Sequence, residues 1–459
     1  MNTALLGQQQ QQVDAVLAAC PPARIADIVR EAGIVGAGGA GFPTYVKLQA
    51  KAEIYLVNAA ECEPLLKVDQ QLLARDAARL VRGLRYGMAA TGAREGIIAL
   101  KAKYKAAIAA LEPLLAPPLR LHILPDVYPA GDEVITIWQA TGRRVPAGAL
   151  PITLGVVVNN VQTLLNLACA LEDGTPVVRR TLTVNGAVKQ PMTLTVPLGV
   201  TLREVLALAG GPTIANPAYL NGGPMMGKLV GNLDSPVTKT TGGLLVLPAD
   251  HLLIQRRLRT DESILAMART VCEQCGLCTD LCPRHLIGHE LPPHLLVRAM
   301  NYQQVATPSI LLSALTCSEC SVCESYACPV GISPMRINQL LKKQLRQQGA
   351  RYQGELRPAD ALAEYRMVPI KRLISRLQLE PFYHEAPMQT PDWQPAQVTL
   401  PLQQHIGAPA DPIVQVGDAV TVGQCIASAK AGALSVALHA SIAGHVSAVS
   451  ASSITLSRG

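Results

Sequence analysis

Apolar residues repeat at helical spacing near the start of the chain. Four of them stand at i, i+3, i+4 and i+7: Val13, Val16, Leu17 and Cys20. Together with the glutamine run at 8–12, this spacing predicts an amphipathic helix and polar linker within residues 1–20. Such a helix docks on a shell or partner protein or packs on its own domain, and the pattern leaves both alternatives open.

A second helical repeat leads into a glycine-rich run. The repeat consists of Ile25, Ile28, Val29 and Ala32, and it predicts a helix that ends at Gly33. The run itself contains Gly36, Gly38, Gly39 and Gly41, which match G-x-G-x-x-G. A dinucleotide fingerprint requires a strand before these glycines, whereas a helix precedes them here. The run is a flexible loop or a close approach to a phosphate or flat ring, with Lys47 supplying positive charge.

Strand-like alternation appears later in the chain. Residues 181–184 alternate, the Asn-Gly pair at 185–186 suits a type I′ hairpin, and a second strand follows. A capping box at 201–204 then predicts a helix that stops at 210–212. The loop at 221–227 contacts a ligand or partner, or its two methionines fill a gap in the core.

The end of the chain has the same strand-like character. Four valines alternate around two Gly-containing turns: Val414, Val416, Val420 and Val422. His439 and His445 follow, and we expect both to be core or surface residues because a lone histidine is seldom a ligand. Before this region, residues 345–400 are polar, basic and rich in proline, which favours a connector that lies over other domains.

Composition narrows the class of protein. A chain of 459 residues with 49% hydrophobic and 16% charged residues is expected to fold, as about three domains. The net charge of +7 and 3% aromatic content argue against a nucleic-acid surface. Three uncharged stretches, 145–171, 205–227 and 431–457, are interrupted by polar residues, glycine or proline, so no membrane span is predicted. No secretory signal pattern is present, and a reducing cytoplasm is expected.

The cysteines give the most specific signal. Eight of the 12 fall in two runs that end in Cys-Pro: Cys272, Cys275, Cys278 and Cys282, then Cys317, Cys320, Cys323 and Cys328. The first run has the spacing of bacterial two-cluster ferredoxins, and the second has one extra residue before its last cysteine. Because the Pro-flanked cysteine turns toward the neighbouring cluster, we predict two 4Fe-4S clusters with crossed ligands: Cys272, Cys275, Cys278 and Cys328 for one, and Cys317, Cys320, Cys323 and Cys282 for the other. The alternative of structural zinc usually combines two separated C-x2-C pairs.

Four ordered motifs resemble a known domain. They are the run 36–47, the segment 58–64 (NAAECEP), the segment 128–133 (YPAGDE) and the segment 158–164 (VNNVQTL). Together they resemble the FMN-binding domain shared by the flavin subunit of respiratory NADH dehydrogenases and the C subunit of Rnf complexes. The resemblance implies that FMN is held by Gly36, Gly38, Gly39, Gly41, Lys47, Asn58, Gly131, Asn159, Asn160 and Thr163. It also implies that NADH stacks near Phe42, with Glu61 and Glu63 close by.

The motifs depart from the NADH dehydrogenase pattern at three positions. Ala60 replaces an acidic residue, Leu65 replaces the glycine after Glu-Pro, and Ala50 lacks the second aromatic ring of the nicotinamide pocket. FMN is therefore the safer expectation, and NADH depends on the remaining motif residues.

The order of modules extends the resemblance to nearly the whole chain. Residues 176–250 resemble the β-grasp, soluble-ligand-binding module of the same families, and the C-terminal part resembles a barrel-sandwich hybrid. In the Rnf protein that β module precedes the flavin domain, whereas here it comes last, an order similar to the cobalamin reductases of propanediol-utilisation microcompartments. The expected fold is multidomain α/β and α+β, divided as follows: 1–20 N-terminal helix, 21–175 FMN-binding α/β domain, 176–250 β-grasp domain, 255–345 two-cluster ferredoxin-like helical domain, 346–400 connector and 401–459 barrel-sandwich hybrid.

This resemblance implies a cytoplasmic, microcompartment-associated reductase of cob(III)alamin or cob(II)alamin. Electrons would pass from NADH through FMN and two 4Fe-4S clusters to cobalamin, and an adenosyltransferase or shell protein would be a partner. Two alternatives remain open at this stage: an Rnf-type protein that exchanges electrons between NADH and ferredoxin, and a non-enzymatic electron-transfer scaffold.

Overall fold

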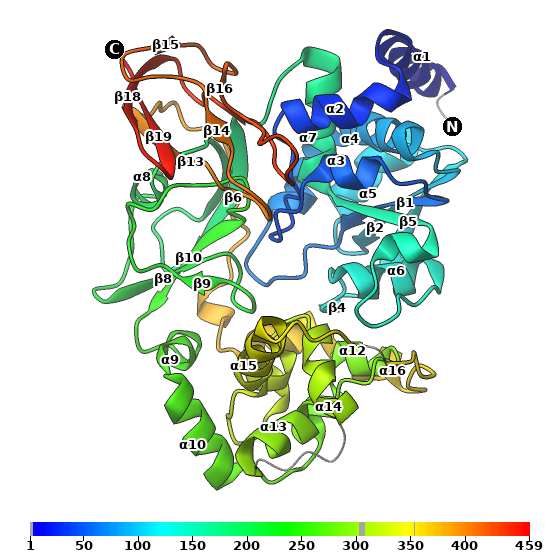
Figure 1. Ribbon diagram of the computed structural model, residues 1–459, viewed down its shortest axis with the longest axis vertical. Helices are drawn as coiled ribbons and strands as arrows, with labels where there is room; N and C mark the ends of the chain where they lie inside the picture. Colours follow the sequence, from blue (N-terminus) through cyan, green and yellow to red (C-terminus); the bar gives the residue numbers. More distant parts are fainter. Residues whose placement is uncertain (1–2, 303–307, 353) are drawn as a thin grey trace.

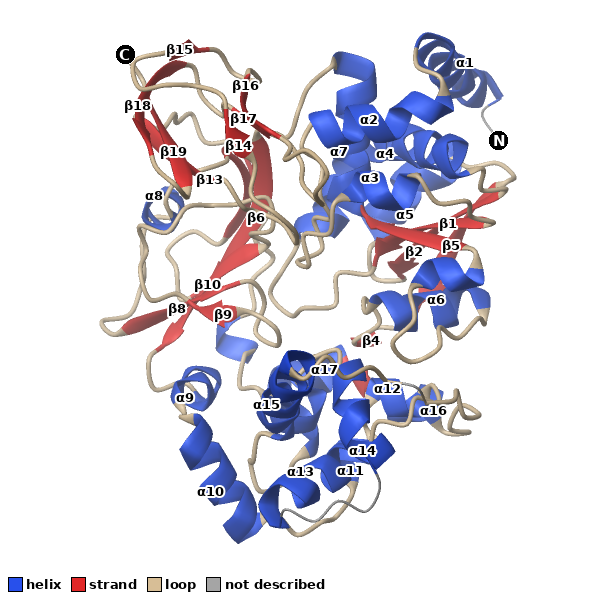
Figure 2. Cartoon of the chain, in the orientation of Figure 1, coloured by secondary structure: helices blue, strands red, loops and turns tan. Residues whose placement is uncertain are grey.

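Long apolar runs build a parallel sheet in the first domain. The strands are β1 (Ile54–Ala59), β2 (Glu95–Lys101), β3 (Leu119–Leu124) and β5 (Val156–Asn160), in the order β3-β2-β1-β5. The helices are α1 (Thr3–Ala19), α2 (Pro22–Glu31), α3 (Thr44–Leu48), α4 (Val68–Thr91), α5 (Lys105–Leu111), α6 (Glu133–Thr141) and α7 (Val161–Asp173). Helices α2, α4 and α7 cover one face of the sheet and α6 covers the other (Figure 2), so the sheet is buried on both sides. The computed structural model describes residues 3–302, 308–352 and 354–459.

The N-terminal helix packs on its own domain. Val13 of α1 is 2% exposed and belongs to the same core as α4. Gln9 accepts a hydrogen bond from Arg82 of α4 at 3.1 Å, which ties the helix to the domain by a polar contact as well. Of the two alternatives for this helix, the structure therefore shows packing on its own domain. The helix predicted to end at Gly33 is also present, as α2.

The second domain is a mixed sheet with one helix. Its elements are β6 (Arg179–Gly186), β7 (Met192–Pro197), α8 (Leu202–Leu208), β8 (Pro217–Asn221), β9 (Lys228–Leu229) and β10 (Gly243–Pro248). The sheet has the order β12-β7-β6-β10-β8-β9, where β12 (Met388–Gln389) arrives from the connector. The predicted capping box is confirmed, because the Thr201 and Glu204 side chains each bond to the backbone of the other residue.

The predicted hairpin is present, because β6 and β7 pair antiparallel, but its turn does not lie at 185–186. Asn185 and Gly186 are the last residues of β6, and the chain turns afterwards, before β7 begins at Met192. The Asn185 side chain is fully buried and donates hydrogen bonds to the carbonyls of Leu65 and His384. The pairing of β6 with β10, which places Gly186 beside Val246, extends the strand through the expected turn.

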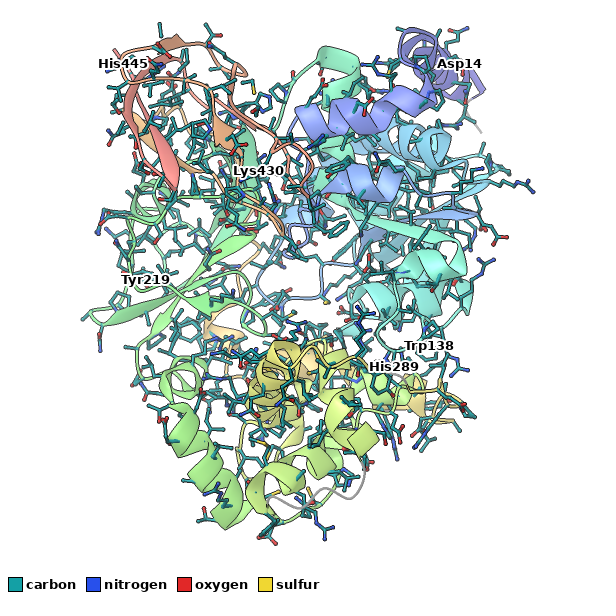
Figure 3. The ribbon with its side chains drawn as sticks, viewed as in Figure 1. Asp14, Trp138, Tyr219, His289, Lys430 and His445 are labelled. Carbon is teal, nitrogen blue, oxygen red and sulfur yellow. The ribbon has the colours of Figure 1, made fainter. Side chains whose placement is uncertain are left out.

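The third domain is a small helical lobe at the lower end of the molecule (Figure 1). It contains α9 (Leu252–Leu258), α10 (Asp261–Val271), α11 (Leu277–Asp280), α12 (Pro283–Leu286), α13 (Pro293–Tyr302), α14 (Pro308–Ser313), a π-helical turn (Cys323–Ala327) and α15 (Pro334–Gln347). The ring of His289 in this lobe, labelled in Figure 3, lies 2.8 Å from the carbonyl oxygen of Val145 in the first domain.

The connector ties the lobes together. It contains α16 (Ala363–Arg366), β11 (Val368–Pro369), α17 (Ile370–Arg376) and β12. Strand β11 pairs with β4 (Val127–Tyr128) of the first domain, and β12 pairs with β7 of the second. The connector therefore adds a strand to each of two domains after the chain has passed through the helical lobe.

The C-terminal domain consists of two small sheets. One has the order β13-β19-β18-β15, from β13 (Gln397–Pro401), β19 (Ser453–Ser457), β18 (Gly444–Val449) and β15 (Ala419–Val420); the other has the order β14-β16-β17, from β14 (Asp411–Pro412), β16 (Cys425–Ser428) and β17 (Leu438–His439). The predicted valine alternation is only partly right. Val420 is buried, but Val416 and Val422 lie in turns and are 64% and 57% exposed. Among the helices of the described residues, none has both the length and the apolar character that a bilayer span requires.

Candidate functional site

The carboxyl edge of the parallel sheet gathers three of the predicted asparagines. Chain order runs from β1 to β2 and β3 on one side, whereas β5 lies on the other side of β1, so β1 and β5 form a topological switch point. Asn58 donates to the carbonyl of Gly131 at 2.8 Å, and Asn160 donates to Asp69 at 2.8 Å while capping α7. Asn159 is buried and donates to Tyr55. Ligands of open α/β sheets bind at such a switch point.

The glycine-rich run lies over this edge. The amide of Ala37 donates to Thr163 at the start of α7, at 2.9 Å, which anchors the run to the switch point. A Cβ on Gly39 would meet no atom within 4 Å, and one on Gly38 would meet only Asn160, at 3.8 Å. These two glycines thus leave open space beside the asparagines, as a flat cofactor requires. Gly41 instead has φ +65° and packs closely, because a Cβ there would lie 2.9 Å from Thr240 and 3.3 Å from His405.

The predicted cation faces the same edge. The amino group of Lys47 lies 2.9 Å from a carboxylate oxygen of Glu133, the first residue of α6, and donates to the carbonyl of Val158 at 2.8 Å. Lys47 belongs to α3, and Phe42, two residues before that helix begins, is half-buried. The structure therefore places Asn58, Asn160, Thr163 and Lys47 near the glycine-rich run at one edge of the sheet, with open space beside Gly38 and Gly39. The full set of residues that hold FMN stays a prediction.

The two predicted glutamates are engaged in the protein. Glu61 accepts a hydrogen bond from the amide of Asp69 at 3.0 Å, and burial raises the pKa of both carboxyls. Glu63 accepts from the amides of Met225 at 2.9 Å and Met226 at 2.8 Å, and burial raises its pKa to about 7. Glu63 thus binds the loop 221–227 of the second domain. Met225 of that loop is buried and Met226 is 55% exposed.

The eight cysteines form two groups in the helical lobe. Four of them line one pocket: Cys282, Cys317, Cys320 and Cys323. We call these the inner group. The pKa of Cys278 is raised to about 12 by burial and by nearby thiols, of which Cys328 is the strongest and Cys275 and Cys272 follow. We call these four the outer group: Cys272, Cys275, Cys278 and Cys328. Cys282 thus shares a pocket with the second run, and Cys328 is a neighbour of Cys278 in the first run. This grouping agrees with the crossed ligand sets, which stay a prediction.

The cavity suits a multi-iron cluster. In the described residues, no three Cys, His, Asp or Glu side chains converge on one metal-ion position. The four inner thiols instead line one pocket, and burial raises the pKa of each of them, so their thiolates need a strongly positive partner. These residues fit an iron–sulfur cubane.

The inner group borders the carboxyl edge of the sheet. Tyr128 donates its hydroxyl hydrogen to the carbonyl of Cys320 at 2.8 Å. Asp132, which caps α6, forms an ion pair at 2.8 Å with Arg284, and Arg284 lines the cysteine cavity. Gly131, the partner of Asn58, lies between these two contacts in the chain. A single segment, 128–132, therefore touches both the inner cysteine group and the carboxyl edge of the parallel sheet. We call this edge the flavin edge, because the residues predicted to hold FMN lie along it.

The outer group lies nearer the surface. In the outer group Cys275 is exposed, Cys272 and Cys278 are partly exposed and Cys328 is buried. In the inner group Cys317 and Cys320 are partly exposed and Cys282 and Cys323 are buried, so only the outer group has an exposed cysteine. Three sites thus follow one another in space: the sheet edge, the inner group and the outer group, which reaches the surface at Cys275.

Sequence reasoning missed several residues that hold this site together. Arg180 of β6 donates to the carbonyls of Ala37 at 2.9 Å and Thr241 at 2.6 Å, so it fastens the glycine-rich run to the second domain. Asp69 and Arg284 have comparable roles. Arg284, two residues after a cysteine, offered only a weak signal, and Asp69 and Arg180 offered none.

Four segments of the chain match known domain families. Residues 29–169 match the Nuo51 FMN-binding domain, 181–229 the SLBB domain, 271–333 a 4Fe-4S dicluster domain and 385–458 the RnfC barrel sandwich hybrid domain. These matches, in this order, confirm the predicted fold class of α/β, β-grasp, helical cluster and barrel-sandwich modules.

Three curated proteins show how far the similarity extends. The cobalamin reductase PduS of Salmonella typhimurium strain LT2 is 67% identical over 435 residues, which cover 95% of this chain and 96% of that protein. The protein of the same description from Citrobacter freundii is 65% identical over the same shares. The RnfC-type component of the Na⁺-translocating ferredoxin:NAD⁺ oxidoreductase complex of Acetobacterium woodii is 38% identical over 57% of this chain and 58% of that component.

Proposed function

The chain belongs to the family of the cobalamin reductase PduS, flavin and iron–sulfur oxidoreductases, and from that membership we propose that it passes electrons from NADH to cobalamin. The proposed carriers are one FMN and two 4Fe-4S clusters. A flavin accepts two electrons and releases them singly, while each cubane carries one, which matches single-electron reduction of cobalt.

One observation carries the proposal: the inner cysteine group touches the segment 128–132, which also contacts Asn58 at the sheet edge. Electron transfer requires carriers that are held close together and shielded from water. The contacts of Tyr128 and Asp132 hold the helical lobe against the flavin edge, and burial of Cys282 and Cys323 excludes solvent. We propose the order sheet edge, inner group, outer group, acceptor.

The chain's own residues hold the cofactors and supply no acid or base. The residues proposed to hold FMN are Asn58, Asn159, Asn160, Thr163 and Lys47, together with Gly36, Gly38, Gly39, Gly41 and Gly131. The inner and outer cysteine groups are the proposed ligands of the two clusters. Amides that donate to sulfur, such as Glu319 to Cys317 at 3.4 Å, stabilise negative charge at the cluster and adjust its potential.

The proposed donor enters beside Phe42. Its ring is half-buried next to the glycine-rich run, so one part of it remains available for stacking. Glu61 and Glu63 shape the neighbouring loop through the backbone bonds that they accept. Location in or on a bacterial microcompartment, and contact with an adenosyltransferase or shell protein, complete the proposal by analogy with the family.

Anaerobic assays test this function directly. Purified protein is expected to contain about eight irons and one FMN, NADH should bleach the flavin, and aquacobalamin should then be reduced. Ferredoxin, tested beside aquacobalamin, is the control acceptor.

Each contrary result identifies an alternative. Faster reduction of ferredoxin than of cobalamin would favour an Rnf-type activity. A flavin that is present but not bleached by NADH would contradict the proposed donor, and a protein that holds clusters without FMN would be an electron-transfer scaffold.

A further inference from the structure

A buried asparagine of α15 faces the inner cysteine group. Asn338 is 0% exposed, and it lines the same pocket as the four inner cysteines. The nitrogen of its side-chain amide lies 3.8 Å from the sulfur of Cys317, and its oxygen has no hydrogen-bond partner within the described part of the chain. Asn338 lies outside both cysteine runs, in the helix that follows them.

An amide buried in this way is unfavourable unless a partner satisfies it. A leucine of similar volume would fill the position without that cost. A neutral thiol is a weak acceptor of hydrogen bonds, whereas a thiolate bound to iron carries negative charge and accepts strongly. The amide of Asn338 therefore gains a strong partner only when Cys317 ligates a cluster.

Two further side chains of α15 hold the loop of Cys317 in front of Asn338. Lys342 donates to the carbonyl of Cys317 and to a carboxylate oxygen of Glu319, each at 2.7 Å. Gln339 donates to the other carboxylate oxygen of Glu319 at 2.8 Å. Because residues four apart on a helix share a face, Asn338 and Lys342 approach this loop side by side. These contacts fix the amide of Asn338 relative to the sulfur of Cys317.

The outer group has a corresponding amide from a different source. Gln274, two residues after Cys272, donates from its side-chain nitrogen to the sulfur of Cys272 at 3.2 Å. The same position of the second run is Glu319, whose carboxylate is held by α15. The first cysteine of each run therefore faces a side-chain amide, from its own loop in the outer group and from α15 in the inner group. Gln274 is partly exposed, whereas Asn338 is fully buried.

We propose that Asn338 donates a hydrogen bond to the sulfur of Cys317 in the inner cluster and thereby raises the midpoint potential of that cluster. A reduced cluster carries one more negative charge than an oxidised one, so a donor at its sulfur stabilises the reduced state more. The effect is larger where water is excluded, which favours Asn338 over Gln274. A higher potential at the inner cluster favours transfer of electrons from the flavin. The inference rests on the clusters of the proposed function, but not on its donor or acceptor.

Redox titration with dithionite, followed by electron paramagnetic resonance, measures the midpoint potentials of both clusters without NADH or cobalamin. Asn338→Leu removes the amide and keeps a similar volume. We expect the ratio of reduced to oxidised inner cluster at a fixed potential to fall about tenfold, which corresponds to about 59 mV for one electron. The other midpoint should not move. Gln274→Leu should instead lower that other midpoint, and by less.

Asn301→Leu is the matched control. Asn301 is a buried asparagine of α13 in the same lobe, but its amide donates to the carbonyl of Ala268 at 2.9 Å and not to a sulfur. This variant should shift neither midpoint. Asn338→Ala, which adds no volume, is the second variant at the proposed position. Analysis of iron and labile sulfide shows whether each protein holds both clusters.

Pulsed electron paramagnetic resonance gives a readout that needs no variant. In wild-type protein whose asparagine nitrogens carry a heavy isotope, we expect a coupling between one such nitrogen and the reduced inner cluster. Absence of this coupling would overturn the inference even if both Asn338 variants lost their iron.

The remaining outcomes separate the inference from the proposed function. Unchanged midpoints in Asn338→Leu and Asn338→Ala, with both clusters present, would overturn the inference and leave the proposed function intact. A shift of the same midpoint by Asn338→Leu and Gln274→Leu would also overturn it, because both amides would then act on one cluster. A wild-type protein that holds no cluster would overturn the proposed function and the inference together.

Discussion

Leu65 shows how one residue departs from the NADH dehydrogenase pattern and what the departure costs in free energy. It occupies the position where the NADH dehydrogenase pattern has glycine, and its φ is +70°. The left-handed region costs a non-glycine residue about 1–2 kcal/mol. The Leu65 side chain is 1% exposed in the core between the first domain, the second domain and the connector. Its burial offsets the strain.

Leu65→Gly is expected to destabilise the protein by about 1–3 kcal/mol, because loss of a buried leucine costs about 2–5 kcal/mol and relief of strain returns only part of it. The midpoint of chemical unfolding measures this change. Gln378→Gly is the control, since Gln378 also has a positive φ, +55°, but is exposed. If Leu65→Gly proved neutral or stabilising, burial would not be the compensation.

Single residues could be predicted where a local pattern names them. The cysteine spacing and the asparagine motif identified side chains that the structure brings together. Their supporting partners could not be predicted, because Arg180 and Ala37 are 143 residues apart in the chain. No local pattern reports a contact that only the packing of two domains creates.

Helices and strands could likewise be predicted where the cause lies within the segment, and not where it lies in a distant part of the chain. The α2 helix could be predicted from its apolar spacing and α8 from its capping box, because both signals lie within the segment itself. The β6–β7 hairpin is present, but its turn is not the Asn-Gly pair, because β10 pairs with β6 through Gly186 and draws these residues into the sheet. The C-terminal valines failed in part because short strands leave Val416 and Val422 in turns.

Strand β17 carries a group that makes the C-terminal domain sensitive to acid. His439 is 6% exposed, and burial together with the positive charge of Lys239 lowers its pKa to about 4. Above its unfolded pKa of about 6.5, both states hold a neutral ring and stability is complete. As the pH falls from 6.5 toward 4, only the unfolded chain gains the proton, so stability is lost.

At pH 5 this loss is expected to be about 2 kcal/mol relative to pH 7. Thermal unfolding of the His439→Leu variant at both pH values should show a smaller decline than the wild type. His445→Leu is the matched control, because His445 is exposed on β18 (Figure 3). An identical decline in wild type and His439→Leu would contradict the assignment.

At the scale of the whole molecule, the helical lobe connects the flavin edge with the surface. The inner cysteine group touches the segment 128–132, and the outer group contains the exposed Cys275. The two groups are thus inequivalent, although their sequence runs are nearly the same. Sequence spacing predicted the crossed arrangement but not which group is inner, since that depends on how the lobe docks.

This inequivalence predicts different effects for two cysteine substitutions. In Cys320→Ser, dithionite should still reduce the outer cluster, but NADH should reduce almost none of it. In Cys275→Ser, NADH should still reduce the inner cluster. Iron content and electron paramagnetic resonance after each reductant provide the measurement. Reduction of the outer cluster by NADH in Cys320→Ser, at the wild-type rate, would reverse the proposed order.

The C-terminal domain closes against the glycine-rich run, where the amide of Ile406 donates to the carbonyl of Gly41 at 3.1 Å and Arg30 reaches the carbonyl of Ser435. These contacts join residues that lie more than 360 positions apart in the chain. The glycine-rich run therefore gains this neighbour only after the ribosome has synthesised the C-terminal domain, and a chain truncated before residue 396 would lack both contacts.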